Sequence, residues 1–282
     1  SNKYNLIINK LDELDILIAK KEYKFEGLIY EDAENKSLFR KELTLRNLQR
    51  IKEFKLIEWC EKHIYRFPID FIKDKDLNYN FPIYSAQTRL KFISDITLSI
   101  ILLIISIPIF LLVSLIIKIE DGGPILYSQM RVGKNGKIFK LWKFRSMKIN
   151  SEEEGPKWSQ KNDTRITKVG TILRMSRIDE LPQLFCVLKG DMSLIGPRPE
   201  RPEIELTLEK EINYYSYRKL FKPGLSGWAQ VNYPYGASIQ DSKVKLSYDI
   251  FYIENFSTLL DFIIFFKTIK LVLNLKGSKP NT

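Results

Sequence analysis

Two neighbouring acidic residues, Asp179 and Glu180, are the part of this 282-residue sequence best suited to chemistry. Pro182 follows two positions later, and Gly190 lies a few residues further on. Proline is tolerated in the first turn of a helix and glycine often ends one, which predicts a short helix from about Asp179 to Lys189. Because a helix N-terminus attracts anions, the two acids would lie where a phosphate can bind.

The acid pair has two interpretations. Consecutive side chains on a helix diverge by about 100°, so one acid could attack an electrophile while the other holds a divalent cation. In the structural alternative, Asp179 only caps the helix and Glu180 is an ordinary first-turn acid. The residues around the pair are needed to choose between them.

Arginines flank the acid pair on both sides. Arg174 and Arg177 precede it, and Arg198 follows between Pro197 and Pro199, whose rings restrict the backbone. A stiffly held guanidinium is suited to bidentate capture of a phosphate or a planar base edge. The chain has a single histidine, which excludes a multi-histidine metal site or proton relay. Acids, arginines and a divalent cation together indicate phosphoryl transfer.

An apolar segment, residues 96–117, contains no charged residue. About 20 such residues cross the hydrocarbon layer as a helix, but Pro108 lies near the middle and predicts a kink or break. Basic residues flank both ends, so the positive-inside rule is satisfied best with both ends on the cytoplasmic face. We therefore expect a re-entrant helix that bends and returns, with one simple span as the alternative.

The net charge of +11 is concentrated beside this segment, where residues 118–148 hold eight Lys or Arg and two acids. This clustering indicates a surface for lipid phosphates or a phosphorylated ligand, against the alternative of an ordinary solvated face. Near the C-terminus, residues 259–275 are apolar with three interspersed charges. That pattern predicts an amphipathic helix in the membrane interface, or a core helix of the soluble domain.

The N-terminal part has the composition of a small α/β unit. Residues 25–30 and 54–59 have the pattern of strands and residues 38–52 that of a helix, which predicts a βαβ unit. Residues 61–88 contain prolines, Asn and Asp typical of a linker. The chain begins with Ser-Asn instead of Met, so we expect further natural sequence upstream.

Five longer motifs resemble those of the bacterial monotopic phosphoglycosyl transferases, in the same order and over residues 88–275. They are GKNGKIFKLWKFRSM (133–147), DTRIT (163–167), DELPQL (179–184), KGDMSLIGPRP (189–199) and PGLSGWAQ (223–230). The resemblance implies transfer of a sugar-1-phosphate from a UDP-sugar to undecaprenyl phosphate, with release of UMP. This reaction initiates the assembly of exopolysaccharide, capsule, O-antigen or glycoprotein glycans.

The resemblance also implies roles for single residues. Asp179 would be the nucleophile that forms a covalent phosphosugar intermediate, with Glu180 as its catalytic partner and ligand of Mg²⁺. Arg174 would contact a phosphate and Arg198 the nucleotide. The full implied phosphate-binding or nucleotide-binding set is Arg174, Arg198, Pro197, Pro199, Lys143 and Arg145.

Two departures from the family pattern matter. The family breaks its re-entrant helix at a Ser-Pro pair, whereas here Ile107 precedes Pro108 and Ser106 lies one place earlier. We expect the break to persist through the proline. After Ala-Gln-Val-Asn the family has Gly-Arg, where this chain has Tyr-Pro-Tyr-Gly at 233–236. A phosphate contact from an arginine in that loop is therefore not expected.

We predict a mixed α/β fold with a mostly helical catalytic domain, a re-entrant membrane hairpin and amphipathic interfacial helices. The expected segments are a partial α/β domain (1–62), a linker (63–88), the re-entrant helix (89–120), the catalytic domain (121–275) and a tail (276–282). This organisation resembles the larger branch of the family, which has transmembrane helices upstream. The expected location is the bacterial inner membrane, with the catalytic domain on the cytoplasmic face.

The expected partners are a UDP-sugar, undecaprenyl phosphate and membrane lipids; a homodimer is an open alternative to a monomer. A non-catalytic scaffold that binds polyprenyl phosphate or glycosyltransferases is the second hypothesis, but it would not need both acids and the arginines. Nucleic-acid binding through the positive charge explains neither the apolar segment nor the acid pair. Sugar preference depends on the shape of the pocket, which motifs do not define.

Overall fold

The computed structural model describes residues 27–30, 52–78, 86–151, 163–233, 236 and 238–274. The chain divides into two compact units, Ser1–Ile64 and Tyr65–Thr282. The second unit contains the acid pair and the long apolar segment, and it is mostly helical. A mixed α/β fold is therefore confirmed.

In the first unit, β1 (Gly27–Tyr30) pairs in parallel with β2 (Lys52–Lys55). The prediction of a strand over 54–59 is wrong beyond Lys55, because α3 occupies Leu56–Ile64. Buried Ile57 and Cys60 are three residues apart, which is a helical spacing. Of the helix predicted over 38–52, only Lys52 is described, and it begins β2.

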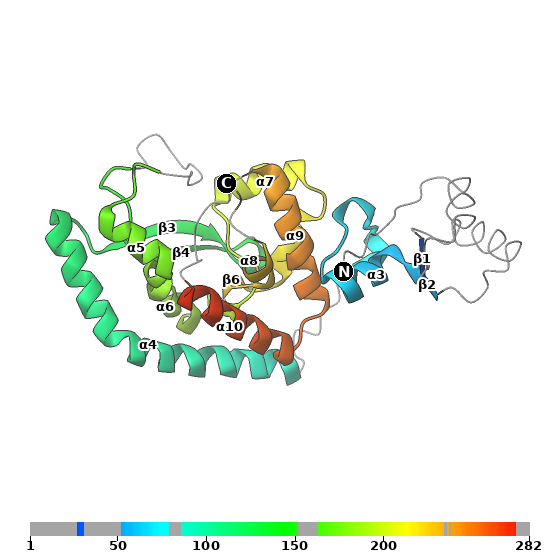
Figure 1. Ribbon diagram of the computed structural model, residues 1–282, viewed down its shortest axis with the longest axis horizontal. Coiled ribbons are helices and arrows are strands. Elements are labelled where there is room, and N and C mark those ends of the chain that lie inside the picture. Colours follow the sequence, from blue (N-terminus) through cyan, green and yellow to red (C-terminus); the bar gives the residue numbers. More distant parts are fainter. Residues whose placement is uncertain are drawn as a thin grey trace, which may run out of the picture. The chain divides into compact units, whose positions relative to one another are not determined.

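The predicted membrane segment forms α4, a continuous 36-residue helix over Ala86–Asp121 that contains Pro108. Figure 1 shows that α4 is bent along its length, as expected for a helix with an internal proline. Only 17% of its most apolar 18-residue window is buried, and it is the one helix in the described ranges long and apolar enough to cross a membrane. The predicted break is thus a bend within one helix, and the re-entrant return stays a prediction.

One side of α4 packs on the rest of the second unit. Val113 and Ile117 are buried in a cluster with Phe144 and Leu173. Phe144 belongs to β4 (Ile138–Phe144), which pairs with β3 (Leu126–Val132) in an antiparallel hairpin. The hairpin turn contains Asn135 and Gly136 with φ of 54° and 77°, a left-handed backbone that Asn-Gly tolerates well. Through Phe144 the hairpin therefore packs on α4.

The acid pair lies in a helical segment between α5 (Lys168–Ser176) and a second parallel strand pair. The predicted helix over 179–189 is a 3₁₀-helix over Ile178–Gln183 followed by α6 (Leu184–Leu188). Strand β5 (Ser193–Ile195) then pairs in parallel with β6 (Gly224–Ser226). Strand β5 directly precedes the Gly-Pro-Arg-Pro residues 196–199, and β6 lies within the motif at 223–230, so the two motifs meet in space.

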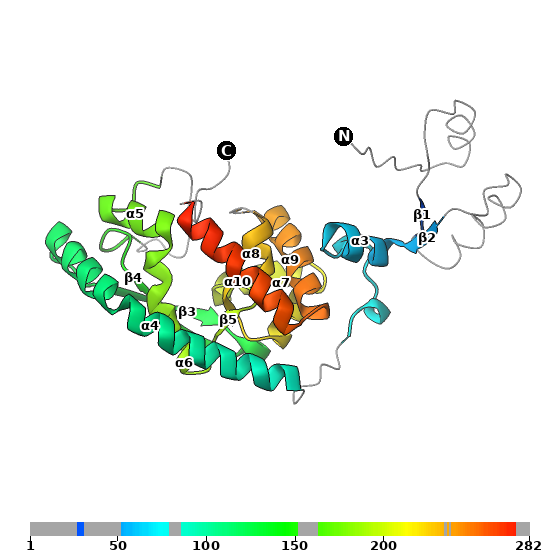
Figure 2. The same cartoon turned by 60° about the horizontal axis from the view of Figure 1, so that its bottom comes forward.

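Four further helices follow in the described part of this unit. They are α7 (Pro202–Glu211), α8 (Trp228–Asn232), α9 (Ile239–Glu254) and α10 (Thr258–Leu273), with short 3₁₀ turns at Ile69–Phe71, Asp74–Asp76 and Tyr215–Leu220. Leu246, Ile250 and Ile253 of α9 are completely buried. Figure 2 shows α10 alongside α8.

The helix predicted over 259–275 is present as α10. Unlike a helix buried in a core, it has apolar side chains exposed on one side. Ile264 is buried, whereas Leu259, Phe262 and Phe266 are exposed by at least 50%. An exposed apolar side of this kind fits the expected interfacial helix, whose location in a membrane interface stays a prediction.

Candidate active site

The buried acid pair follows a residue, Arg177, whose backbone has a left-handed conformation. Arg177 has φ of 56° and ψ of 17°, and it separates the end of α5 from the 3₁₀-helix that holds both acids. At the other end of α5, Thr167 caps the helix by accepting a hydrogen bond from the Gly170 backbone amide at 2.9 Å. The chain therefore turns sharply before the acids, and Asp179 and Glu180 are only 7% and 8% exposed.

Glu180 is held by two cations from different elements. Arg198 donates from Nη2 to Glu180 Oε1 at 2.5 Å, and Lys143 Nζ of β4 lies 3.4 Å from the same oxygen. Burial acts to raise the pKa of Glu180, but the charges of Arg198, Lys143 and Arg177 outweigh it and hold this pKa well below its ordinary value. Glu180 is therefore ionised at all physiological pH values.

Asp179 has the opposite electrostatic situation. Its burial and the neighbouring charge of Glu180 raise its pKa from 3.8 to about 6, against the opposing effect of Lys143, Arg174 and Arg198. At neutral pH the group is still mostly ionised, as a nucleophilic carboxylate must be. Two adjacent carboxylates thus have well-separated pKa values, a pattern typical of catalytic sites.

Burial also shifts the pKa values of cations around the two acids. Burial lowers the pKa of Lys143 to about 8, although the charge of Glu180 opposes the shift. Burial also lowers the pKa of Arg177, against the charges of Glu180 and Asp179. A site with several buried cations around two carboxylates has positive charge available for a phosphorylated substrate.

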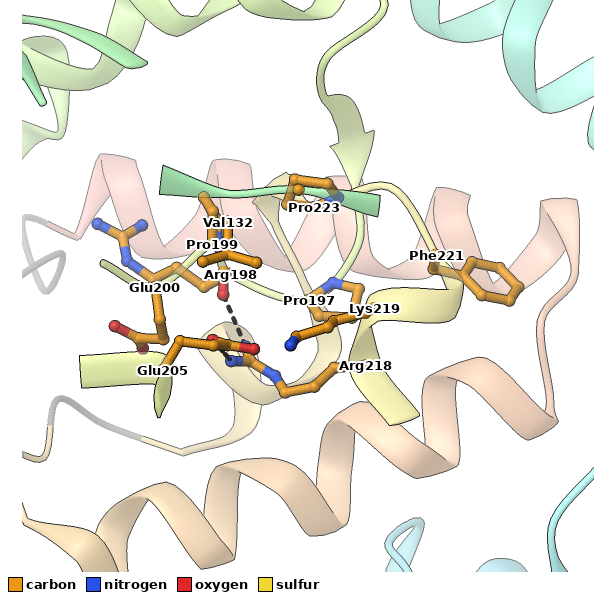
Figure 3. Close-up of a pocket in the computed structure, with 11 residues that line it drawn as sticks. Val132, Pro197, Arg198, Pro199, Glu200, Glu205, Arg218, Lys219, Phe221 and Pro223 are labelled. Carbon is orange, nitrogen blue, oxygen red and sulfur yellow. Dashed lines mark hydrogen bonds and ion pairs between the residues drawn. The ribbon is translucent and has the colours of Figure 1, made fainter. Parts of the chain in front are cut away.

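Three hydrogen bonds to backbone carbonyl oxygens fix the loop of Pro197, Arg198 and Pro199. Arg218 Nη2 donates to the Arg198 carbonyl at 2.6 Å, Arg131 Nη1 donates to the Pro199 carbonyl at 2.9 Å, and the Gly224 amide donates to the Pro197 carbonyl at 2.8 Å. Figure 3 shows Arg218 directed at the Arg198 carbonyl beside a small cavity of about 20 Å³. The loop is therefore preorganised before any substrate arrives.

Arg218 is itself held by buried acids. Its Nε lies 3.1 Å from Asp249 Oδ2, and its Nη1 lies 3.7 Å from Glu205 Oε2. Burial raises the pKa of Asp249 to about 6, against the charge of Arg218. The sequence offers no local signal for this network, because its members come from α7, α9 and the 3₁₀ turn before β6.

The structure brings together four of the predicted site residues, Asp179, Glu180, Lys143 and Arg198, with Arg174 acting on Asp179 electrostatically. Pro197 and Pro199 lie in the fixed loop and line its cavity. Ser106 and Pro108 lie within α4, where Ser106 is buried. These positions agree with the roles implied by the resemblance, which themselves stay predictions.

Arg145 lies in a different set of contacts. Its guanidinium forms a two-pronged ion pair with Asp121 at the end of α4, and its Nε donates to the Pro124 carbonyl at 2.6 Å. These contacts fasten the end of α4 to the strand hairpin. Its predicted contact with substrate stays a prediction.

The carboxylates also fit the expected magnesium ion. Among the described residues, no group of three or more His, Cys, Asp or Glu could hold a metal alone. However, Mg²⁺ is usually bound by one or two protein carboxylates together with substrate phosphates and water. The repulsion that Glu180 exerts on buried Asp179 is the kind of strain that a bound cation would relieve. We therefore regard this pair as a suitable magnesium site once a phosphate is present.

Several curated proteins are similar to this chain. A UDP-N-acetylgalactosamine-undecaprenyl-phosphate N-acetylgalactosaminephosphotransferase of Aeromonas hydrophila is 44% identical over 76% of this chain and 50% of its own. An Escherichia coli (strain K12) UDP-glucose:undecaprenyl-phosphate glucose-1-phosphate transferase is 36% identical over 68% of this chain and 42% of its own. A Salmonella typhimurium undecaprenyl-phosphate galactose phosphotransferase is 41% identical over 67% of this chain and 41% of its own.

The chain spans half the length, or less, of these relatives. Residues 86–275 match the family model described as bacterial sugar transferase. That match begins with α4 and includes the acid pair, the Arg198 loop and α10, so every part of the site lies within it. The chain belongs to the bacterial sugar transferase family.

Proposed function

We propose that this protein transfers a sugar-1-phosphate from a UDP-sugar to undecaprenyl phosphate, with release of UMP. The observation that supports this most directly is the buried pair of Asp179 and Glu180 among Lys143, Arg177 and Arg198. The relatives named for undecaprenyl-phosphate sugar transfer support the choice of acceptor.

The proposed chemistry has two displacements at one phosphorus atom. An Asp179 carboxylate oxygen attacks the β-phosphorus, and the bond from that phosphorus to the bridging oxygen breaks, so UMP leaves with the bonding electrons. A phosphate oxygen of undecaprenyl phosphate then attacks the same phosphorus and releases the Asp179 carboxylate. The products are a lipid-linked diphosphosugar and the regenerated enzyme.

The chain's own groups prepare these steps. Arg198 and Lys143 fix Glu180 and keep it ionised, which leaves Asp179 as the group with the raised pKa. The cations Lys143, Arg177 and Arg198 would compensate the charge of the diphosphate. Mg²⁺ bound by Glu180 and a substrate phosphate would supply further neutralisation of the leaving UMP.

We also propose that α4 and α10 hold the catalytic unit on the cytoplasmic face of the bacterial inner membrane. The exposed apolar sides of both helices support a lipid environment. The three relatives are named for N-acetylgalactosamine, glucose and galactose. Since these names differ, the sugar must be assigned by experiment.

The test is an assay of UMP release with Mg²⁺, undecaprenyl phosphate and a panel of UDP-sugars. We expect release with at least one sugar, and none from Asp179→Asn. Incubation with Mg²⁺ and a UDP-sugar radiolabelled in the sugar, without undecaprenyl phosphate, should leave label covalently attached to wild type and not to Asp179→Asn. The absence of release with every sugar would exclude the enzyme and favour the scaffold, which would bind polyprenyl phosphate without turnover.

A further inference from the structure

Asp95 is a buried carboxylate on a helix whose sides are otherwise largely exposed and apolar. It is 8% exposed, whereas its neighbours Phe92 and Ile93 are 54% and 60% exposed. Asp95 lies immediately before the uncharged run of residues 96–117. A buried carboxylate is costly unless it is hydrogen-bonded, and one at the edge of a membrane segment usually has a defined task.

The partners of Asp95 lie almost 100 residues away, on β5. Ser193 Oγ donates to Asp95 Oδ2 at 2.7 Å, and the Leu194 backbone amide donates to Asp95 Oδ1 at 3.1 Å. Both carboxylate oxygens are therefore used, one for a side chain and one for the backbone of the same short strand. Such charge-assisted hydrogen bonds are the stronger kind in proteins.

A second link connects the same two regions through α10. Lys91, one helical turn before Asp95, forms an ion pair with Asp261 at 2.7 Å. The Tyr252 hydroxyl lies 2.7 Å from Asp261 Oδ1 and 3.2 Å from the Ile195 carbonyl oxygen. This link also ends on β5, so α4 is connected to the strand directly through Asp95 and indirectly through Asp261 and Tyr252.

Strand β5 leads directly into the loop that contains Arg198. Only Gly196 and Pro197 separate its last residue from Arg198, and the Gly196 amide donates to the Ser226 carbonyl at 2.8 Å. Beyond this short connection, Arg198 Nη2 lies 2.5 Å from Glu180. Strand β5 therefore joins the contacts of Asp95 to the loop that places Arg198 against Glu180.

We propose that Asp95 is a positioning residue that couples the docking of α4 to the geometry of the active site. Through Ser193 and Leu194 it fixes β5, and through β5 it holds Arg198 against Glu180. The catalytic consequence rests on the function proposed above, whereas the effect on β5 does not. In this arrangement the helix that contacts lipid also aligns the groups that contact substrate.

Two measurements test the coupling in the full chain in detergent or lipid nanodiscs. The first is hydrogen exchange of backbone amides at 193–199, with β3 and β4 as the internal reference. The second is kcat/KM for UMP release. The variants are Asp95→Ala and the milder Asp95→Asn and Ser193→Ala, which serve if Asp95→Ala does not fold. The matched control is Thr97→Val, because exposed Thr97 bonds only the Ile93 carbonyl of its own helix, at 2.8 Å.

We expect Asp95→Ala to increase exchange at 193–199 and to lower kcat/KM by about 10- to 100-fold, the size of effect that a small misplacement of a catalytic group produces. Ser193→Ala removes the donor to Asp95 Oδ2 and the oxygen that accepts from the Ile195 amide at 3.3 Å, and it should lower kcat/KM by about 3- to 10-fold. Asp95→Asn keeps an oxygen for Leu194 and should recover part of the activity. Thr97→Val should match wild type in both measurements.

A double-mutant cycle separates positioning from general destabilisation. If Asp95 acts through Arg198, Asp95→Ala should change the residual rate of an Arg198→Ala enzyme by less than about twofold. An equal loss in both backgrounds would overturn the proposal. So would unchanged exchange at 193–199 in Asp95→Ala and Ser193→Ala. If wild type itself released no UMP, the proposed function would fail, while the exchange data would still decide whether Asp95 fixes β5.

Discussion

The pKa values of Asp179 and Lys143 predict a bell-shaped dependence of activity on pH. Asp179, with a pKa of about 6, must be ionised to attack, and Lys143, with a pKa of about 8, must be charged to hold Glu180. We therefore expect kcat/KM for UMP release to be highest between these values and to fall about tenfold per pH unit outside them. The measurement is a pH profile from 4.5 to 9.5 at constant ionic strength.

Substitution of Lys143 tests whether its charge sets the two pKa values that limit the profile. Its charge lowers the pKa of Asp179, so Lys143→Met should move the acid limb to higher pH and abolish the alkaline limb. Loss of a charged hydrogen-bond partner predicts a decrease of about 10- to 100-fold in the maximum rate. Lys143→Arg keeps the charge on a group that does not titrate below about pH 12. Its acid limb should stay near 6 and its alkaline limb should disappear.

Lys140→Met is the matched control, because Lys140 lies on the same strand but is exposed and stacks on Trp142 at 4.6 Å. Its profile should match wild type. An acid limb that stays in place, or moves to lower pH, in Lys143→Met would refute the electrostatic account. So would a flat wild-type profile between pH 5 and 7.

The same pKa shift has a consequence for stability, with a definite sign. Folded Asp179, with a pKa of about 6 against an ordinary 3.8, binds more protons than unfolded Asp179 between these pH values. Its contribution to the free energy of unfolding should therefore decrease as pH rises through that window, by about 3 kcal/mol in total. Asp179→Asn should remove this dependence in thermal unfolding.

Other predictions address the rest of the unit. Arg218→Met leaves Asp249 buried without its cation and should lower the free energy of unfolding by about 3–5 kcal/mol in a denaturant titration, whereas a change below 1 kcal/mol would contradict the network. Gly170→Ala would place a Cβ 2.0 Å from the Ser146 carbonyl oxygen and should lower the melting temperature markedly; an unchanged melting temperature would contradict the close packing. Removal of divalent cations with EDTA should abolish UMP release and Mg²⁺ should restore it; release that persists would exclude the metal. Cysteines introduced at Gln87 and Ser128 should both be labelled from the cytoplasmic side, whereas labelling from opposite sides would establish a spanning helix.

Local sequence patterns were sufficient for part of this structure. The acid pair, the helix at the apolar segment and the helix near the C-terminus follow from proline placement and apolar composition, which act over a few residues. The prediction of a strand over 54–59 is wrong because a short run of mixed apolar and charged residues fits both the two-residue period of a strand and the 3.6-residue period of a helix. The buried residues Ile57 and Cys60 have the helical spacing.

Long-range contacts could not be predicted in this way. Arg218 meets the Arg198 carbonyl, and Asp95 meets β5, across sequence separations that no local pattern encodes. Only the family motif points to Lys143, because the pattern of its own strand does not indicate a contact with Glu180, 37 residues away. The chemical groups of the site were thus visible in the sequence, but the framework that fixes them was not.

The left-handed backbone of Arg177 implies opposite demands from folding stability and from catalysis. A non-glycine residue in this conformation costs about 1–2 kcal/mol, so Arg177→Gly would relieve strain between α5 and the acids. It would also remove a cation that helps to keep Glu180 ionised. Selection for thermal resistance alone would favour the glycine, whereas selection for the proposed transferase activity would retain the arginine. A library screened under both regimes should therefore diverge at this single codon.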